Sequence, residues 1–364
     1  APVDTFFQAE YITANFSIKS FLGGSISLSS AKVSNGQFNL VIEPYMDADT
    51  MTTRVNLKRI FKLGGSKNEK KRNDNEIFFI RNVALENMRF TMRNFNRDSN
   101  VIGADAINWY DMDVSDINVS GRRLRMKGGV MYGICDKMSF REKSGYICYH
   151  LSGNTSVGNG KTFIGDLRLI DGWSDITIPE FTLTYANTEA WSDFISKVRM
   201  KGEISRSTVS MSSLGFFAPA LKNFRMTTEI SGLMNGYVND FRLKNIRFKT
   251  TDTDGFGTKS GANNGGISGE MNGSITGLPD SKAMLLSADV KKLTFTSHGL
   301  ERFIKGWAPD VNLKLDNICK DKAITFSGRA KGPLNRLHAT GKLHSKFGIV
   351  HADISLRNLL DSYR

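Results

Sequence analysis

One short pattern occurs three times in this chain and constrains its fold more than any other feature: apolar-x-x-apolar-x-apolar-x-Asn-x-x-Phe. The copies comprise Leu28, Ala31, Val33, Asn35 and Phe38; Ile80, Val83, Leu85, Asn87 and Phe90; and Val238, Phe241, Leu243, Asn245 and Phe248. Apolar and polar residues alternate within each copy, which is typical of a β-strand with one face away from water. A unit repeated along a chain favours an elongated, stacked β-structure over a compact enzyme.

The Asn of each copy predicts a change of direction. Asn35-Gly36 is a preferred two-residue turn of a β-hairpin, and such a turn would bring the apolar residues of both strands onto one face. Met88 and Ile246 occupy the position of Gly36 in the other copies, and a β-branched residue disfavours the positive φ that this turn requires. Those copies are expected to form a wider turn or a bend within a continuing strand.

Three further segments, which begin at Val114, Ile178 and Val290, contain the first half of the pattern. Their three-residue step breaks the period of two, and a β-bulge at that step would return both apolar residues to one face. Repeated bulges curl a sheet. The predicted fold is therefore an all-β, elongated and curled antiparallel sheet with an apolar concave face and a few short helices.

The composition agrees with this fold and excludes several functions. The chain has 364 residues, including 34 Gly and only 7 Pro, and long helical patterns are nearly absent. Its net charge is +13, but aromatic residues are not interleaved with the basic ones, so no nucleic-acid interface is expected. The densest basic run, Lys67–Arg72, is interpreted as a solvated loop. No apolar stretch is long enough for a membrane-spanning helix, and no signal peptide begins at Ala1.

The expected organisation is a lead-in segment followed by two continuous parts of one β-groove. The boundaries are residues 1–24, with helical turns near Phe6–Tyr11, then 25–200 and 201–364. Short helices are predicted at residues 188–198, with Thr188 as the cap, at 213–221 and at 298–307. Loops are predicted at residues 64–76 and 251–266.

The candidate chemical motifs support no catalytic site. Asp111, Asp113 and Asp116 alternate with apolar residues, and so are expected to face water from a strand. The Gly-Lys-Thr at 160–162 resembles part of a phosphate-binding loop, but a strand rather than a helix is expected after it. The five histidines lack the spacing of a metal site. We therefore expect no enzyme, no cofactor and no metal.

Two of the three cysteines flank a predicted hairpin over residues 136–147. A turn centred between Arg141 and Glu142 would place Cys135 opposite Cys148, where a disulfide is one of two outcomes and free thiols are the other. Cys319 is left over.

Four segments resemble TamB-type proteins, the inner-membrane component of the translocation and assembly module. They are Ser139–Tyr146; Ser192–Leu221, with Ser207-Thr208-Val209 and Phe217-Ala218-Pro219-Ala220-Leu221; Ile230-Ser231-Gly232 with Gly236 and residues 241–248; and Gly277-Leu278-Pro279-Asp280. In this order they cover most of residues 25–300. The wider resemblance is to AsmA-like, repeating β-groove proteins.

This resemblance implies a location and a function. Such proteins are anchored in the inner membrane of Gram-negative bacteria, cross the periplasm as a curled sheet called a β-taco, and conduct phospholipid along its apolar concave face. A C-terminal domain meets an outer-membrane barrel of the Omp85 class. This chain shows neither the anchor nor that domain, so it resembles an internal, periplasmic segment whose contacts with the inner membrane and the barrel are made by parts not in this chain.

The predicted partner is therefore phospholipid, with its acyl chains in the groove. The candidate lining residues are Ile26, Leu28, Val33, Phe38, Leu40, Ile77, Phe79, Val83, Leu85, Phe90, Met92, Ile117, Val119, Phe181, Leu183, Phe241, Leu243 and Phe248. Two alternatives remain: the same residues filling a closed β-sandwich or barrel, and a scaffold or chaperone that offers its free strand edges to outer-membrane β-barrel proteins during assembly.

Overall fold

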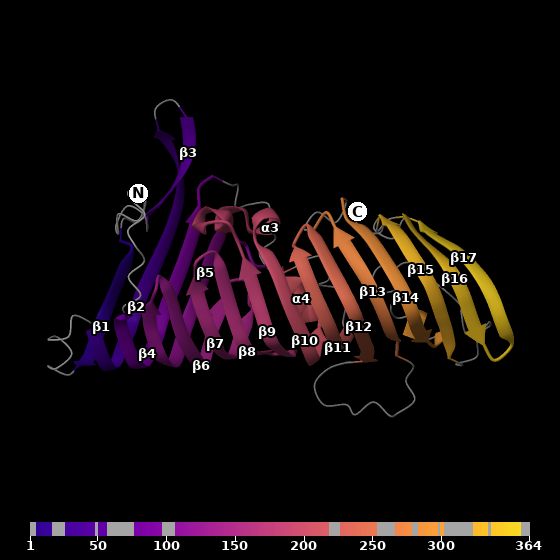
Figure 1. The fold of residues 1–364 in the computed structure, drawn as a ribbon, viewed down its shortest axis with the longest axis horizontal. Helices are drawn as coiled ribbons and strands as arrows, with labels where there is room; N and C mark the ends of the chain where they lie inside the picture. Colours follow the sequence, from indigo (N-terminus) through magenta and orange to yellow (C-terminus); the bar gives the residue numbers. More distant parts are fainter. Residues whose placement is uncertain are drawn as a thin grey trace. The chain divides into compact units, whose positions relative to one another are not determined.

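The computed structural model divides the chain into two compact units, unit 1 (residues 1–172) and unit 2 (residues 173–364). It describes residues 5–16, 26–47, 50–56, 76–96, 106–217, 226–252, 266–278, 283–297, 299–301, 323–333 and 336–357. The boundary lies at Gly172, rather than near residue 200 as the sequence suggested. Each unit is a curled, unclosed and almost entirely antiparallel β-sheet (Figure 1), which confirms the predicted fold class.

In its described residues, unit 1 has eight strands. They are β1 (Phe7–Phe16), β2 (Ile26–Asp47), β3 (Thr50–Val55), β4 (Glu76–Asn94), β5 (Asp111–Lys127), β6 (Val130–Glu142), β7 (Ile147–Gly158) and β8 (Lys161–Asp171). They pair in the order β1-β2-β4-β5-β6-β7-β8, and β3 pairs with the end of β2. The β2–β4 pair is parallel, whereas the others are antiparallel.

The described part of unit 2 has nine strands that pair in chain order, each antiparallel to the next. They are β9 (Asp175–Thr184), β10 (Arg199–Ser210), β11 (Met226–Tyr237), β12 (Asp240–Asp252), β13 (Ser268–Thr276), β14 (Leu285–Phe295), β15 (Ile324–Pro333), β16 (Arg336–Ser345) and β17 (Gly348–Arg357). Its short helices are η2 (Thr188–Asp193), α3 (Phe194–Lys197) and α4 (Met211–Phe217).

Bulges interrupt the strands as the three-residue step predicted. Asn35, Asn87 and Asn245 have φ of 52°, 51° and 52°, and the strands continue past all three. Asp116 has the same conformation between Val114 and Ile117, and the register shifts between Val290 and Leu293. No shift is recorded at Ile178, where the same pattern predicted one. The prediction of a hairpin turn at Asn35-Gly36 is therefore wrong. The bend within a continuing strand, predicted as one of two possibilities for the copies with Asn87 and Asn245, is confirmed.

Other local predictions have mixed outcomes. The helical turns near Phe6–Tyr11 are wrong, since β1 pairs with β2 over this stretch. The helices predicted at 188–198 and 213–221 are present as η2–α3 and α4, although Asn187 rather than Thr188 accepts the capping hydrogen bond from Ala190 N (3.1 Å). Residues 299–301 lie in a helical turn, with Leu300 N donating to Thr296 O (3.0 Å). The rest of that helix, the loop at 64–75, Cys319 and most of the loop at 251–266 lie outside the described residues.

Candidate functional site

Unit 1 has an unbroken row of apolar residues across seven strands. Each member is the register partner of the next: Ile12, Val33, Leu85, Val119, Met138, Leu151 and Leu169. Residues opposite one another in a sheet point to the same side. This row and the residues that alternate in phase with it define the apolar face of unit 1.

In unit 2, three such rows cross seven or more strands. The first is Phe181, Gly202, Met234, Leu243, Gly273, Ala288, Ala330, Ala339 and Ile354, across all nine strands. The second is Ile230, Phe248, Gly269, Leu293, Phe326, Leu343 and Val350. The third is Leu183, Met200, Gly236, Phe241, Ile275, Leu286 and Gly332. None contains a polar side chain, so the apolar face of unit 2 is continuous from β9 to β17 in the first row.

The structure places sixteen of the predicted lining residues on these faces. They are Ile26, Leu28, Val33, Phe38, Leu40, Val83, Leu85, Phe90, Met92, Ile117, Val119, Phe181, Leu183, Phe241, Leu243 and Phe248. The other two are corrected. Phe79 pairs with Ser27 and Arg125 on the opposite face, because its neighbour Ile80, the partner of Leu28, lies on the apolar face three residues before Val83. Ile77 lies at a register irregularity between Glu76 and Phe78. Phe78 takes the predicted place on the apolar face.

Some residues of these apolar faces were not predicted from the sequence. Met138 and Leu151 were not predicted, nor were Met234, Met271 and Phe326. For Phe326 no signal was available, since its strand contains none of the repeated pattern. Leu293 was detectable, because Val290-x-x-Leu293 carries the three-residue step.

Side chains on the apolar face pack sideways along one sheet. In unit 1 the buried residues Met88, Val114 and Ile117 form a cluster whose half-buried neighbours all come from β2, β4, β5 and β6. These are adjacent strands of the same sheet, so the apolar contacts of this cluster run from strand to strand. Most of the predicted lining residues are accordingly half-buried rather than buried.

Glycines on the apolar face make room for large neighbours. A Cβ atom at Gly269 would lie 2.7 Å from Phe248 Cε1 and 3.2 Å from Leu293 Cδ1. At Gly36 it would lie 2.6 Å from Met88 Cε. The large side chains therefore lie flat across the glycines, which smooths the apolar surface along the sheet.

Polar side chains satisfy the backbone where the bulges open the sheet. Asn87 Nδ2 donates to Asn35 Oδ1 (2.8 Å), and Asn118 Oδ1 accepts from Asn87 N (3.0 Å). In unit 2, Asn272 Oδ1 accepts from Asn245 N in the same way (2.8 Å). An unpaired backbone N–H would be costly, so these partners stabilise the bends.

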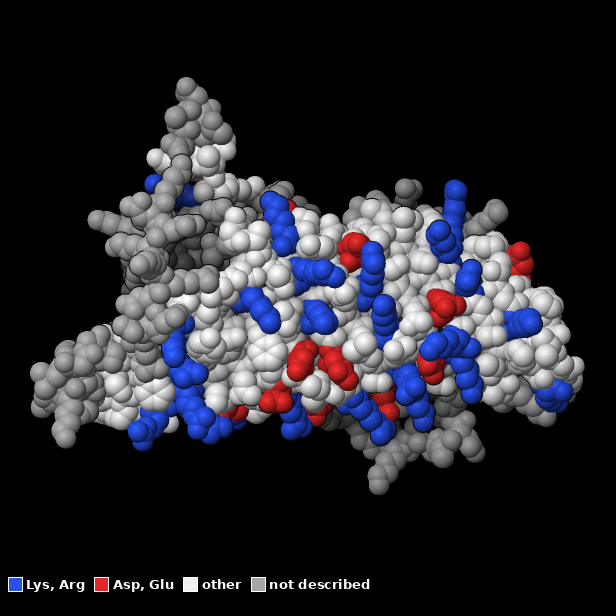
Figure 2. Space-filling view, viewed as in Figure 1, with Lys and Arg blue, Asp and Glu red and all other residues white. Residues whose placement is uncertain are grey.

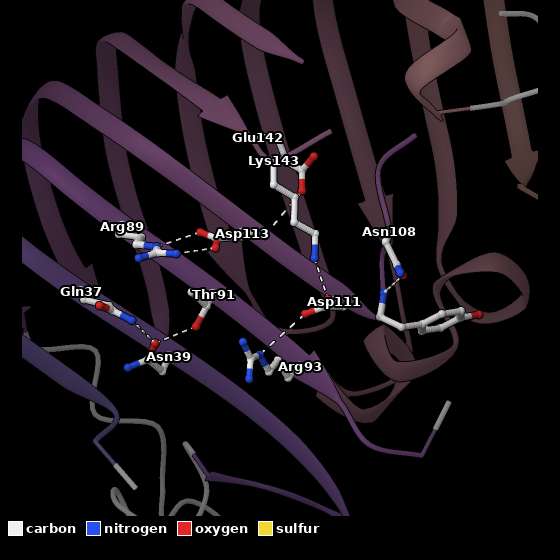
Figure 3. A network of polar contacts seen from close by, with 11 residues as sticks. Gln37, Asn39, Arg89, Thr91, Arg93, Asn108, Asp111, Asp113, Glu142 and Lys143 are labelled. Atoms are coloured by element: carbon white, nitrogen blue, oxygen red, sulfur yellow. Dashed lines mark hydrogen bonds and ion pairs between the residues drawn. The ribbon is translucent and has the colours of Figure 1, made fainter. Parts of the chain in front are cut away.

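The opposite face of the sheet carries the charges. Arg89 on β4 donates two hydrogen bonds to Asp113 on the neighbouring strand β5 (2.8 and 2.5 Å). Lys143, in the β6–β7 turn, donates a hydrogen bond to Asp111 on β5 (2.6 Å; Figure 3). The hydrogen bond from Arg89 is the main reason that the pKa of Asp113 lies below its usual value. Figure 2 shows Lys and Arg side chains standing out on one face of the molecule with acidic ones among them.

A second set of contacts on this polar face involves amides and hydroxyls. Asn39 Oδ1 accepts from Gln37 Nε2 (2.7 Å) and from Thr91 Oγ1 (2.6 Å), which ties β2 to β4 (Figure 3). We therefore assign this network to sheet cohesion.

The other candidate motifs have structural roles. Asp111 and Asp113 form ion pairs, and no group of metal-ligating side chains occurs among the residues that the structure describes. The Gly-Lys-Thr stretch belongs to a hairpin in which Asn159 and Gly160 form the turn between β7 and β8, so the strand expected after it is confirmed.

Of the two outcomes left open for Cys135 and Cys148, the structure shows free thiols. The β6–β7 turn lies at residues 143–145, where Gly145 N donates to Glu142 O (2.9 Å), not between Arg141 and Glu142. This shift pairs Cys148 with Phe140 and Cys135 with Gly153. Burial raises the pKa of both thiols, that of Cys148 to about 11.

Fold and site together define an all-β protein with open sheets, each apolar on one face and charged on the other. Comparisons with families of known proteins, with curated proteins and with solved structures found no match. Among the described residues, no helix has both the length and the apolar character needed to cross a membrane.

Proposed function

We propose that this chain is a periplasmic segment of a TamB- or AsmA-like protein that conducts phospholipids between the inner and outer membranes, with the acyl chains on its apolar face. The observation that carries the proposal is the set of apolar rows that run from strand to strand without a polar side chain, above all the row of nine in unit 2. The sequence resemblance to this family points to the same function.

The physical argument is a transfer free energy. Each acyl CH₂ exposed to water costs about 0.8 kcal/mol, so a sixteen-carbon tail costs on the order of 12 kcal/mol to move unprotected. A lipid chain that stays against an unbroken apolar surface avoids most of this barrier. The process needs no catalytic residue, only continuity, and a single polar interruption would restore part of the barrier.

The charge distribution agrees with a lipid cargo whose headgroup stays outside. In the described strands of unit 2, Lys and Arg side chains belong to the polar face; examples are Arg242, Lys244, Arg247 and Lys249, which alternate with the apolar positions of β12. Burying a headgroup charge on the apolar face would be costly. The tails therefore contact the sheet and the headgroup remains in water.

The test is native mass spectrometry of the purified chain, combined with Leu243→Asp. We expect bound phospholipid in the wild type and its loss in this variant, because a carboxylate interrupts the nine-member row. Lys244→Asp is the matched control, since the neighbouring residue is exposed on the polar face, and it should retain lipid. A thermal unfolding curve for each variant separates lost binding from lost folding. A wild type that never carries lipid, or equal lipid loss in both variants, would exclude the conduit.

The alternative function, a scaffold for outer-membrane β-barrel assembly, is favoured by the exposed outer strands. Tyr11 and Ile12 on β1 are 65% and 67% exposed, and an edge strand can add an incoming strand through its backbone. Crosslinks from β1 to unfolded barrel strands, with no lipid bound, would support this alternative over the conduit.

A further inference from the structure

The strands β15, β16 and β17 of unit 2 carry positive charge with little to balance it. Residues 324–357 include six Lys or Arg, three His and a single acidic residue, Asp353, whereas the whole chain has 49 Lys or Arg to 36 Asp or Glu. Cations that gather without counter-charges create a local field that attracts anions. The polar face of these three strands therefore favours an anionic ligand.

A depression with a volume of about 450 Å³ lies among these charges. Two polar rows form its sides: Arg329, Thr340 and Asp353 are consecutive register partners, and so are Lys342 and His351. Because side chains alternate along a strand, these residues lie on the face opposite the apolar rows of unit 2. The full lining is Gly328, Arg329, Thr340, Gly341, Lys342, His351, Ala352 and Asp353.

Two glycines give the depression a floor of backbone. A Cβ atom at Gly328 would clash with Thr340 O, and one at Gly341 would clash with Ser327 O, so β15 and β16 approach each other closely here. On the apolar face the ring of Phe326 lies across both glycines, with its atoms 2.9 and 2.8 Å from the two Cβ positions. The floor is therefore held between paired strands and packed from behind.

The two strongest cations of the depression lack a counter-ion. Arg329 and Lys342 are diagonal neighbours on β15 and β16, a separation of about 7–8 Å that long side chains can bridge. Neither has a side-chain hydrogen bond or ion pair among the described residues, although Asp289 is the register partner of Arg329 on β14. An anion between these two side chains would remove their mutual repulsion.

We propose that this depression binds a phosphate group, either as inorganic phosphate or as the phosphate monoester of a larger molecule. The Arg329 guanidinium offers a fork of N–H donors that matches two phosphate oxygens, and Lys342 adds a point charge. The Thr340 hydroxyl and the His351 imidazole can donate to the remaining oxygens. The site lies on the polar face between paired strands, so it depends neither on the lipid conduit nor on a free strand edge.

The first test is isothermal titration calorimetry of the whole chain with inorganic phosphate and with glycerol 3-phosphate, in about 0.15 M salt to screen distant charges. We expect saturable one-to-one binding, and the ligand that binds more tightly identifies the source of the phosphate. Lys342→Gln should weaken binding about tenfold, because a charged hydrogen-bond donor is lost.

Lys331→Gln is the matched control for this charge removal. Lys331 is exposed on the same face of β15, two residues from Arg329, but does not line the depression, so this variant should keep the wild-type affinity. Thermal unfolding curves check that both variants fold. The absence of saturable binding to either ligand, or equal weakening by the two substitutions, would overturn the proposal.

The second test predicts a gain rather than a loss. Asp353 is the one carboxylate that lines the depression, so Asp353→Asn should tighten phosphate binding about threefold by removing a repulsive charge roughly 6 Å away. The amide keeps an oxygen for His338 Nε2, which lies 3.5 Å from the Asp353 carboxylate. Unchanged or weaker binding by Asp353→Asn would exclude the phosphate from this depression.

Discussion

At the scale of the residue, the bends of this protein depend on asparagines that adopt a left-handed conformation. Asn245 has φ 52° between Leu243 and Ile246, and its backbone N–H donates to Asn272 Oδ1. The extra residue returns both neighbours to the apolar face. Most side chains disfavour this conformation, whereas Asn tolerates it and Gly adopts it freely.

Replacing Asn245 should therefore separate backbone strain from side-chain loss. We expect Asn245→Ala to lower the free energy of unfolding by about 1–2 kcal/mol, and Asn245→Gly to lower it less, because Gly accepts positive φ. Urea unfolding followed by circular dichroism measures both. Equal losses in the two variants would show that the asparagine side chain, and not the backbone conformation, matters here.

The same dipeptide takes two conformations in this chain. In Asn159-Gly160 both residues have positive φ (53° and 70°) and form the turn between β7 and β8. In Asn35-Gly36 only Asn35 does, and the strand continues. The difference comes from β4, because Gly36 lies beneath Met88 of that neighbouring strand. No local pattern could have distinguished the two, since the deciding contact is 52 residues away in the chain.

At the scale of the element, the position of one turn decides the chemistry of two cysteines. Lys143-Ser144-Gly145 forms the turn of the β6–β7 hairpin, with Gly145 at φ 95°. Glu142 Oε2 accepts from Ser144 N (2.7 Å), which holds the turn from inside. Cys148 is then only 1% exposed, in the ladder opposite Phe140.

Burial of Cys148 predicts a pH dependence of stability. Its pKa is raised from 9.0 to about 11 in the folded chain, so the unfolded state loses this proton first as the pH rises. The contribution of the protonated thiol to the free energy of unfolding is fully present below pH 9 and is lost between about pH 9 and pH 11. At pH 10 the loss amounts to about 1 kcal/mol. Unfolding free energies of the wild type and Cys148→Ala, measured at pH 8 and pH 10, should converge by that amount. A constant difference between the two proteins would contradict it.

At the scale of the molecule, each unit has its own packed cluster. Unit 1 has the Met88, Val114 and Ile117 cluster, and unit 2 has one around Val290, Phe295 and Phe326. Each draws its members from strands of its own unit. The two units that meet at Gly172 in the chain therefore each have apolar packing of their own.

Expressed separately, residues 1–172 and 173–364 should each give a β-type circular dichroism spectrum and a cooperative thermal transition. A non-cooperative melt for either piece would show that its sheet depends on the other. A division at residue 200 is the matched control. It removes β9 and its pairing with β10 from unit 2 and should give a less stable C-terminal piece.

Much of the apolar face was predictable, because alternation and a three-residue step are local signals. Phe90 and Leu243 lie where the pattern put them. Phe79 does not, because the step from Ile80 to Val83 places Ile80 on the apolar face and turns the adjacent Phe79 to the other side. Likewise, the β6–β7 turn was misplaced because several polar residues in a row allow more than one turn position.

By itself, the sequence determined that this protein forms β-strands with one apolar side and bends at Asn, because side-chain alternation and tolerance of positive φ are properties of each residue and its immediate neighbours. Only the tertiary structure decided which residues stand opposite one another: the parallel β2–β4 pair, the rows that cross seven and nine strands, and the separation of Cys135 from Cys148. Register is a relation between distant segments, and it is set where bulges, glycines and their large neighbours fit together across strands.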